Sequence, residues 1–239
     1  VAKRINLSKD EDLDRRTIEE FLLKKFNGNT NAVSILSKNK AISPYKETFS
    51  AMKKKQLQTA RPRQIVITSF DPYYFKQGLN LIASLHRTSL TSVDKILIYN
   101  LNFSPEEKRY LNFLEKVTVI DYPDEVKRFF PEYLDPKSRS YKPAAIRSSE
   151  PHVTDGDLVL WMDAGLSALK DIQVIFDLIS KHQFFMPDHD DKQSWPFFNV
   201  SFTHPKAAEI IGATNRELLA PHLCSCLVGY LRGGKFQNI

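Results

Sequence analysis

The chain has 239 residues, 42% hydrophobic and 26% charged, which fits an ordinary globular protein with one good core. No apolar run approaches the eighteen residues that a spanning helix needs, so we expect no transmembrane segment in this chain. The net charge of +6 lies in residues 1–60, which hold 13 Lys and Arg against 7 Asp and Glu; residues 61–239 hold 21 of each. This neutral main region argues against nucleic-acid binding.

Residues 1–60 predict a basic helical appendage or stem, separate from a domain over residues 61–239. Ser8 and Glu11 form a capping-box pattern, apolar residues then recur at helical spacing, and Gly28 is a natural stop. Ser43 and Pro44 begin a second expected helix. A solvated basic face is the simpler interpretation of the charge, and contact with an anionic surface is the alternative.

From residue 64 onward, short apolar runs alternate with amphipathic stretches. The expected elements are strands over 64–69, 95–99 and 116–120, with helices over 77–85 and 104–115 between them. The helix start at Ser104-Pro-Glu-Glu107 is strong, because a capping serine precedes proline and two acids in the first turn. This order predicts an α/β fold: a Rossmann-type, mostly parallel sheet flanked by helices, as in nucleotide-binding half-domains.

The second half of the domain predicts fewer elements. Residues 123–137 have no regular pattern. The expected elements after them are helices over 141–150, 171–181 and 205–211 and strands over 158–162, 184–186 and 224–231, with a polar loop over 187–195.

The strand over 158–162 ends at a single carboxylate, Asp163. The run is apolar throughout, as expected of a strand buried on both faces of a parallel sheet. Ligands of such sheets bind at the carboxyl ends of the strands. Ala164 and Gly165 follow Asp163, and their small side chains allow a bulky ligand to approach. We therefore take Asp163 as the first candidate for the functional site.

The sequence lacks the glycine-rich loops that cradle phosphates in P-loop and dinucleotide-binding proteins. The turn after the first expected strand of the domain is Ser69-Phe-Asp-Pro-Tyr73, which is not rich in glycine. A diphosphate would therefore have to be held by a divalent cation on an acid at a strand end, or by basic side chains.

A series of short motifs resembles the nucleotide-sugar-dependent glycosyltransferases of the GT-A fold. The likeness is closest to the retaining group that includes glycogenin and the bacterial galactosyltransferases. A GT-A-like family whose strand ends in Trp-x-Asp fits about equally well. The motifs, within residues 64–231, are Ala83-Ser-Leu85, Ser104-Pro-Glu-Glu107, Val159-Leu-Trp-Met-Asp163-Ala-Gly165, Asp171-Ile172 to Leu178-Ile179, and Ser225-Cys-Leu-Val-Gly229.

The resemblance implies transfer of a sugar from a nucleoside diphosphate sugar, expected to be a UDP-sugar, to a hydroxyl of a glycan, protein or lipid. It implies that base and ribose contacts come from the loop after the first strand of the domain, at Thr68, Ser69, Phe70, Asp71 and Tyr74. Lys142 and Arg147, on one helix, would face the diphosphate, and Asp163 would be the catalytic or metal-binding carboxylate beside Gly165.

The expected cofactor is Mn²⁺ or Mg²⁺ bound at Asp163, but the family's second Asp is replaced by Gly165. One carboxylate with diphosphate oxygens makes a weaker cation site. This departure keeps open the alternative of a catalytically inactive GT-A-like binding or scaffold protein.

Other residues have competing interpretations. His204, His222, Cys224 and Cys226 could form a zinc site, although their spacing matches no standard finger and a buried apolar Cys pair is favoured. Asp188, His189, Asp190 and Asp191 predict an exposed loop, with an acceptor or metal role second. Acceptor patterns at Asn6, Asn102 and Asn199 favour a glycoprotein of a secretory lumen such as the Golgi over the cytoplasm, which stays possible.

Overall fold

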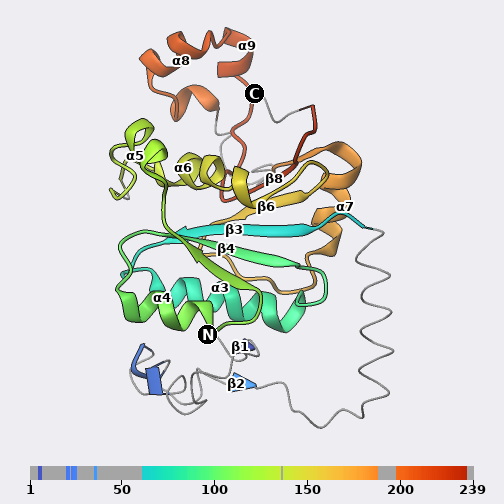
Figure 1. The fold of residues 1–239 in the computed structure, drawn as a ribbon. Helices are drawn as coiled ribbons and strands as arrows, with labels where there is room; N and C mark the ends of the chain where they lie inside the picture. Colours follow the sequence, from blue (N-terminus) through green and yellow to red (C-terminus); the bar gives the residue numbers. More distant parts are fainter. Residues whose placement is uncertain are drawn as a thin grey trace.

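The computed structural model describes residues 5–6, 20–21, 23–25, 35–36, 61–135, 137–187 and 198–235. Its centre is a six-stranded sheet in the order β5-β4-β3-β6-β8-β7 (Figure 1). The strands are β3 (Gln64–Phe70), β4 (Lys95–Asn100), β5 (Val117–Ile120), β6 (Leu158–Met162), β7 (Phe184–Phe185) and β8 (Leu227–Leu231). The predicted α/β class with a mostly parallel sheet is confirmed.

The sheet changes direction at β6. Strands β5, β4, β3 and β6 pair in parallel, with Val66 of β3 opposite Leu160 of β6. β8 then pairs antiparallel with β6, and β7 pairs antiparallel with β8. The carboxyl ends of β3, β4 and β6 therefore lie at one edge of the sheet, which we call the carboxyl edge. We call the opposite edge the amino edge.

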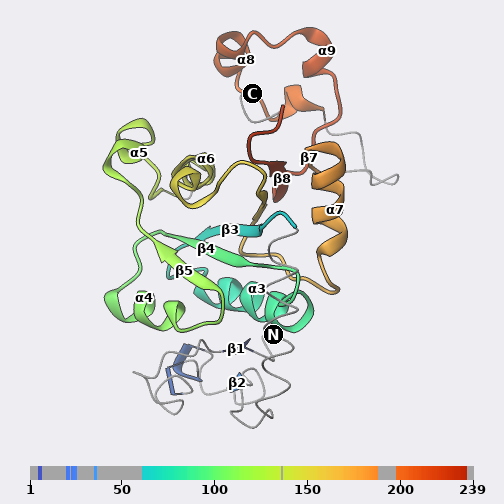
Figure 2. The same cartoon turned by 45° about the vertical axis from the view of Figure 1, so that its right-hand side comes forward.

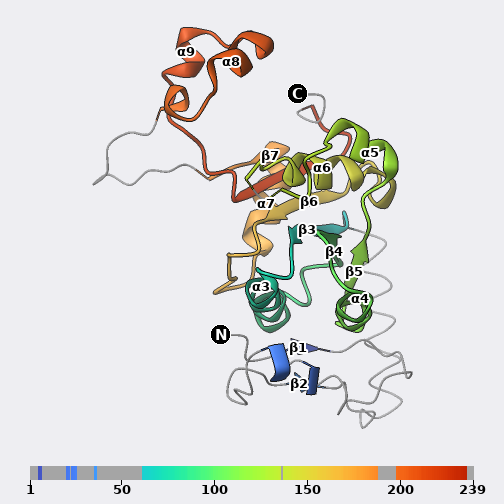
Figure 3. The same cartoon turned by 90° about the vertical axis from the view of Figure 1, so that its left-hand side faces the viewer.

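Helices cover both faces of the sheet (Figure 3). One face is covered by α3 (Phe75–Thr88), α4 (Pro105–Asn112) and α7 (Gln173–His182), and the other by α5 (Asp124–Phe129) and α6 (Tyr141–Ser148). Side chains alternate between the faces along each strand, so β6 sends Leu158, Leu160 and Met162 to the first core, and Val159 and Trp161 to the second. Burial on both sides explains the continuous apolar run.

Two local features fix the α3–α4 face. The predicted capping box of α4 is present, because Ser104 Oγ accepts from the Glu107 backbone N–H and the Glu107 carboxylate accepts from the Ser104 N–H. Gly78 of α3 lies directly under the Phe70 ring, and a Cβ there would come within 2.3 Å of the ring. The glycine therefore lets α3 pack closely on β3.

Some boundaries differ from the prediction. α5 forms in the stretch expected to be irregular; it has no side-chain cap, and its six residues give little periodic signal. Residues 150–152 form a separate 3₁₀ turn, η2 (Glu150–His152), after α6. The last strand begins at Leu227 rather than at Cys224. α7 packs beside β7 and β8 (Figure 2), where Gly229 meets the Ile179 side chain.

Residues 198–222, which precede β8 in the chain, form a small helical lobe outside the sheet. It contains η3 (Asn199–Ser201), α8 (Pro205–Ile211) as predicted, and α9 (Asn215–Leu218), which was not predicted (Figure 1). The polar loop with Asp188, His189, Asp190 and Asp191 lies outside the described residues.

The N-terminal region includes a strand pair that was not predicted. β1 (Ile5–Asn6) and β2 (Ile35–Leu36) pair in parallel. Residues 20–21 and 23–25 are helical, as expected, and the Phe21 ring stacks on Tyr110 of α4 at 3.9 Å between ring centroids. Ser8, Glu11, Gly28 and the second expected helix lie outside the described residues. Phe21 thus joins the core of the main domain.

Within the described ranges, no helix has both the length and the apolar character needed to cross a bilayer.

Candidate active site

A cavity of about 270 Å³ lies at the carboxyl edge of the sheet, on the α6 side. Its walls come from the ends of three parallel strands and from the start of α6. The lining residues are Ser69, Phe70, Asp71, Tyr74, Leu101, Arg139, Tyr141, Asp163, Ala164 and Gly165. Six of the nine predicted site residues are therefore together in one cavity, at the place where doubly wound sheets bind ligands.

Asp163 is fixed in its orientation by two donors. Because side chains alternate along a strand, Asp163 continues on the same side as Trp161, toward α6. The Trp161 indole N–H donates to Asp163 Oδ1 at 2.6 Å, and the Lys142 ammonium lies 2.9 Å from the same oxygen. The Asp163 backbone N–H donates to the Cys226 carbonyl at 2.9 Å. The side chain is still 30% exposed, so it remains accessible from the cavity.

Lys142 connects three parts of the chain. It lies in the first turn of α6, its Nζ pairs with Asp163, and Nζ also donates to the Ser225 carbonyl at 2.8 Å. The ammonium lies 5.5 Å from the centre of the Trp161 ring, within range of a cation–π contact. Only 15% of the side chain is exposed, and it stands behind Asp163 rather than in the cavity lining.

The loop after β3 supplies a second carboxylate and an accessible ring. Asp71 Oδ1 accepts from the Tyr74 backbone N–H at 2.9 Å, which closes the turn before α3. Tyr74 is 45% exposed and lines the cavity, so its ring can stack on a ligand. Asp71 and Tyr74 are thus brought together as the sequence predicted.

Phe70 and Thr68 point into the first core. The Phe70 side chain is 2% exposed, and its ring packs edge-on against Phe75 and Phe103. Its ring is therefore too buried to stack on a ligand, although the residue forms part of the cavity lining. Thr68 is fully buried, and Thr68 Oγ1 has no hydrogen-bond partner among the described residues. Neither side chain is therefore placed to contact a ligand in the cavity.

Ser69 belongs to a buried hydrogen-bond network. Ser69 Oγ donates to the Tyr99 carbonyl at 2.9 Å and lies 3.0 Å from the Tyr122 hydroxyl. The Tyr122 hydroxyl in turn donates to the Tyr141 carbonyl at 3.1 Å. This network ties the end of β3 to the start of α6, two of the elements that line the cavity.

Arg139 and Tyr141 line the cavity but were not predicted as site residues. Arg139 is exposed and has a left-handed backbone (φ 57°), which is uncommon for a residue other than glycine. Burial, and then the Asp163 charge, raises the pKa of the Tyr141 hydroxyl. Their only signal in the sequence is their position at the start of the helix that carries Lys142. The β3 loop, with which they share the cavity, is far from them in the sequence.

Arg147 is placed outside the site. It is exposed and forms an ion pair with Glu150 at 2.9 Å. The expectation that Lys142 and Arg147 share one helical side is wrong for a physical reason: at 3.6 residues per turn, residues five apart point about 140° away from each other. Gly165 lines the cavity, and a Cβ built there would meet nothing within 4 Å.

The four candidate zinc ligands have other contacts. His204 caps α8, and His222 stacks on Phe202. Cys224 Sγ and Cys226 Sγ are free thiols 2.7 Å apart. Burial, followed by the hydrogen bond to Cys224, raises the pKa of the Cys226 thiol to about 11, so it stays protonated at neutral pH. Among the described residues, no group of three or more His, Cys, Asp or Glu could hold a metal ion.

The cavity does not fit a hard divalent cation at Asp163. Such a cation prefers six or more oxygen ligands and a carboxylate free to face it. Asp163 Oδ1 already accepts from Trp161 and pairs with the Lys142 ammonium, and Gly165 offers no second carboxylate. A cation beside this carboxylate would also be repelled by the ammonium.

No protein-family model matches the sequence, and no curated protein matches it either. Two solved structures similar to this chain are glycosyltransferases. One is the apo structure of the bifunctional glycosyltransferase WbbM, with a TM-score of 0.46 and 15% identity over 88% of this chain and 38% of that chain. The other is the apo form of the glycosyltransferase GlyE from Streptococcus pneumoniae TIGR4, with a TM-score of 0.37 and 16% identity over 74% of this chain and 35% of that chain. This chain thus spans well under half the length of either protein.

Proposed function

We propose that the chain is a glycosyltransferase that binds a nucleoside diphosphate sugar, with UDP as the expected nucleotide, in the cavity at the carboxyl edge. The sugar would pass to a hydroxyl of a glycan, protein or lipid acceptor. The observation that carries the proposal is the convergence of Asp163, Arg139, Tyr74 and Tyr141 on one cavity at the ends of parallel strands. These are groups that bind an aromatic base, an anionic diphosphate and sugar hydroxyls.

Each lining group has a proposed role. Tyr74 and Tyr141 offer ring faces to the base, and Arg139 takes the diphosphate contact that the sequence had given to Arg147. Asp163, held by Lys142, accepts hydrogen bonds from ribose or sugar hydroxyls. In the reaction, the bond between the sugar C1 and the diphosphate oxygen breaks, and its electron pair leaves with the diphosphate. The acceptor oxygen bonds to C1, and its proton passes to the departing diphosphate.

Catalysis would come mainly from stabilising the charge on the departing diphosphate. Basic side chains held in place before the reaction do this without reorganising during it. Arg139 is suited to the task, because a guanidinium makes paired hydrogen bonds to phosphate oxygens. Its position just ahead of α6 places it across the cavity lining from the β3 loop.

A thermal-shift experiment with UDP, GDP and their sugars tests this proposal. A ligand present at 100 times its Kd adds about 2.7 kcal/mol to the free energy of unfolding, which for a chain of this size raises Tm by roughly 5–10 °C. We expect Asp163→Ala to abolish this shift. Asp155→Ala, at the other end of β6 and fully outside the cavity, should keep it.

A catalytically inactive binding or scaffold protein is the second candidate. It is favoured by Gly165, which stands where the resembling transferases have a second carboxylate. An assay of sugar-nucleotide hydrolysis across the same panel separates the two. Release of the free sugar supports the transferase, whereas a thermal shift without any hydrolysis supports the binding protein. The absence of a thermal shift with every nucleotide would contradict both nucleotide-binding proposals.

A further inference from the structure

Lys142 occupies one oxygen of the carboxylate that a divalent cation would need. Its Nζ lies 2.9 Å from Asp163 Oδ1, and the same oxygen accepts the Trp161 indole N–H at 2.6 Å. A metal at Asp163 would have to displace the ammonium, because two cations on one carboxylate repel each other. The ammonium and the carboxylate balance each other's charge in the structure as it stands.

Lys142 is held there by contacts that do not depend on a ligand. The Ser225 carbonyl accepts from Nζ at 2.8 Å, and the ammonium lies 5.5 Å from the centre of the Trp161 ring. Trp161 is fully buried in β6, so this wall cannot move away easily. Two contacts, one with β6 and one with the segment before β8, therefore keep the ammonium beside Asp163.

The charges around the cavity balance only when Lys142 is counted. The lining holds two carboxylates, Asp71 and Asp163, and one guanidinium, Arg139. Without Lys142 the wall would carry a net negative charge, which repels an anionic diphosphate. With the ammonium behind Asp163 the wall is neutral, and Arg139 is left to attract the ligand.

We propose that the Lys142–Asp163 pair takes the place of a divalent cation, so that this site binds its nucleoside diphosphate without metal. The inference rests on the proposed function for the identity of the ligand. Lys142 acts through Asp163 as a positioning residue, and the metal-free character of the site follows from its contacts.

The central experiment measures UDP binding by calorimetry in EDTA and in 1 mM Mn²⁺. For the natural chain we expect Kd values within about twofold of each other. Lys142→Met keeps an unbranched side chain of similar length but removes the charge. It should weaken UDP binding in EDTA by about tenfold, because the negative charge of Asp163 then lacks its neighbouring ammonium and repels the diphosphate. Mn²⁺ should restore most of that loss by binding the freed carboxylate. Lys142→Arg keeps the positive charge in a side chain of different shape, and it should bind UDP in EDTA as the natural chain does. That result would show that the charge of Lys142, and not its packing, is what binding requires.

Electron paramagnetic resonance with Mn²⁺ alone tests the inference without any nucleotide. We expect no bound Mn²⁺ that depends on Asp163 in the natural chain. The double variant Lys142→Met with Gly165→Asp should bind Mn²⁺, because a side chain at residue 165 enters open space and supplies the second carboxylate. Circular dichroism checks that each variant is folded.

The outcomes separate the two proposals. If neither UDP nor GDP binds under any condition, the proposed function is contradicted. The Mn²⁺ measurement still decides the role of Lys142. Loss of UDP binding in EDTA would overturn the metal-free inference while supporting nucleotide recognition. Mn²⁺ bound by the natural chain and lost in Asp163→Asn would overturn it as well.

Discussion

Two carboxylates at the two ends of β6 illustrate how differently the edges of this sheet are used. Asp157 directly precedes the strand and Asp163 directly follows it. Asp157 accepts from both Arg63 Nε, at 2.9 Å, and Arg63 Nη2, and also from the Thr154 backbone N–H at 2.7 Å. Asp163 has one ammonium and one indole N–H, both on the same oxygen. Each carboxylate has a basic partner, but of the two it is Asp163 that lines the cavity at the carboxyl edge.

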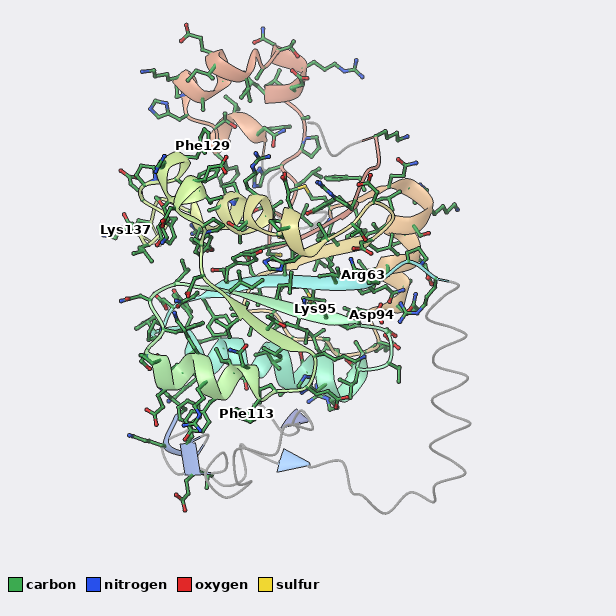
Figure 4. All side chains as sticks on the ribbon, in the orientation of Figure 1. Arg63, Asp94, Lys95, Phe113, Phe129 and Lys137 are labelled. Carbon is green, nitrogen blue, oxygen red and sulfur yellow. The ribbon has the colours of Figure 1, made fainter. Side chains whose placement is uncertain are left out.

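The difference shows which edge stabilises the fold. The Asp157 side chain is only 5% exposed and is saturated with donors, and its hydrogen bond raises the pKa of Arg63. Asp94, which is labelled together with Arg63 in Figure 4, is likewise held by Arg61 through two hydrogen bonds of 2.9 Å. The amino edge is therefore closed by partly buried ion pairs, whereas Asp163 at the carboxyl edge keeps 30% of its side chain exposed and lines the cavity.

The largest stability effect is expected at the amino edge. Asp157→Ala removes four hydrogen bonds, two from Arg63 and two from Thr154, and should lower the free energy of unfolding by about 3 kcal/mol. Urea denaturation measures the loss. Asp155→Ala, two residues earlier and exposed, should change stability by less than about 0.5 kcal/mol. Equal losses for the two variants would contradict the closed amino edge.

A smaller effect is expected from His86, which also lies at the amino edge. Its ring is buried against the Glu115 carbonyl, with 2.8 Å between Nε2 and the oxygen, and burial lowers its pKa to about 4. Its ordinary pKa of 6.5 applies in the unfolded chain, so below pH 6.5 the unfolded chain binds a proton that the folded chain refuses. Stability is full above pH 6.5 and should fall by about 2 kcal/mol between pH 7 and pH 5.

Urea denaturation at pH 7, 6 and 5 measures this decline. His86→Gln removes the titrating group and should flatten most of the curve, leaving the contribution of His152, whose pKa burial also lowers. His182→Gln, at an exposed position, should keep the full decline. A curve that His86→Gln leaves unchanged would show that other groups cause the acid sensitivity.

The smallest of these effects is expected at the carboxyl edge. Tyr122→Phe removes the hydroxyl that lies between Ser69 and the Tyr141 carbonyl, and should lower stability by about 1 kcal/mol. Because α6 then loses one tie to β3, we expect amide exchange to speed up around Tyr141. Hydrogen-exchange mass spectrometry measures this change, and Tyr73→Phe, on an exposed ring, is the matched control. Unaltered exchange in Tyr122→Phe would show that the Tyr122 hydrogen bonds do not hold the start of α6 in place.

Local signals predicted the fold well. The strand over Leu158–Met162 was predicted with its observed bounds, because an apolar run between turn residues has one simple explanation. The capping box at Ser104 and the position of Asp163 directly after the strand were also predicted, because both depend on residues that are close together in the sequence. The antiparallel direction of β8 was not predicted, since alternation along a strand says nothing about the direction of its neighbours.

The site was predicted only in part. Asp71, Tyr74 and Asp163 follow strand ends, and chain order brings strand ends together. Whether Phe70 faces the cavity or the core depends on which face of β3 it occupies. Because β3 is buried on both faces, its sequence does not show which face that is. Arg139 joins the site through the fold of an irregular segment, which leaves no periodic signal in the sequence.

The carbonyls of Ser225 and Cys226 give the site a place in the order of assembly. They hold Lys142 and Asp163, yet they come from a part of the chain that is synthesised long after both. A nascent chain that has already joined its four parallel strands still lacks these two supports. The two supports of the Lys142–Asp163 pair are therefore complete only once the final strand has joined the sheet.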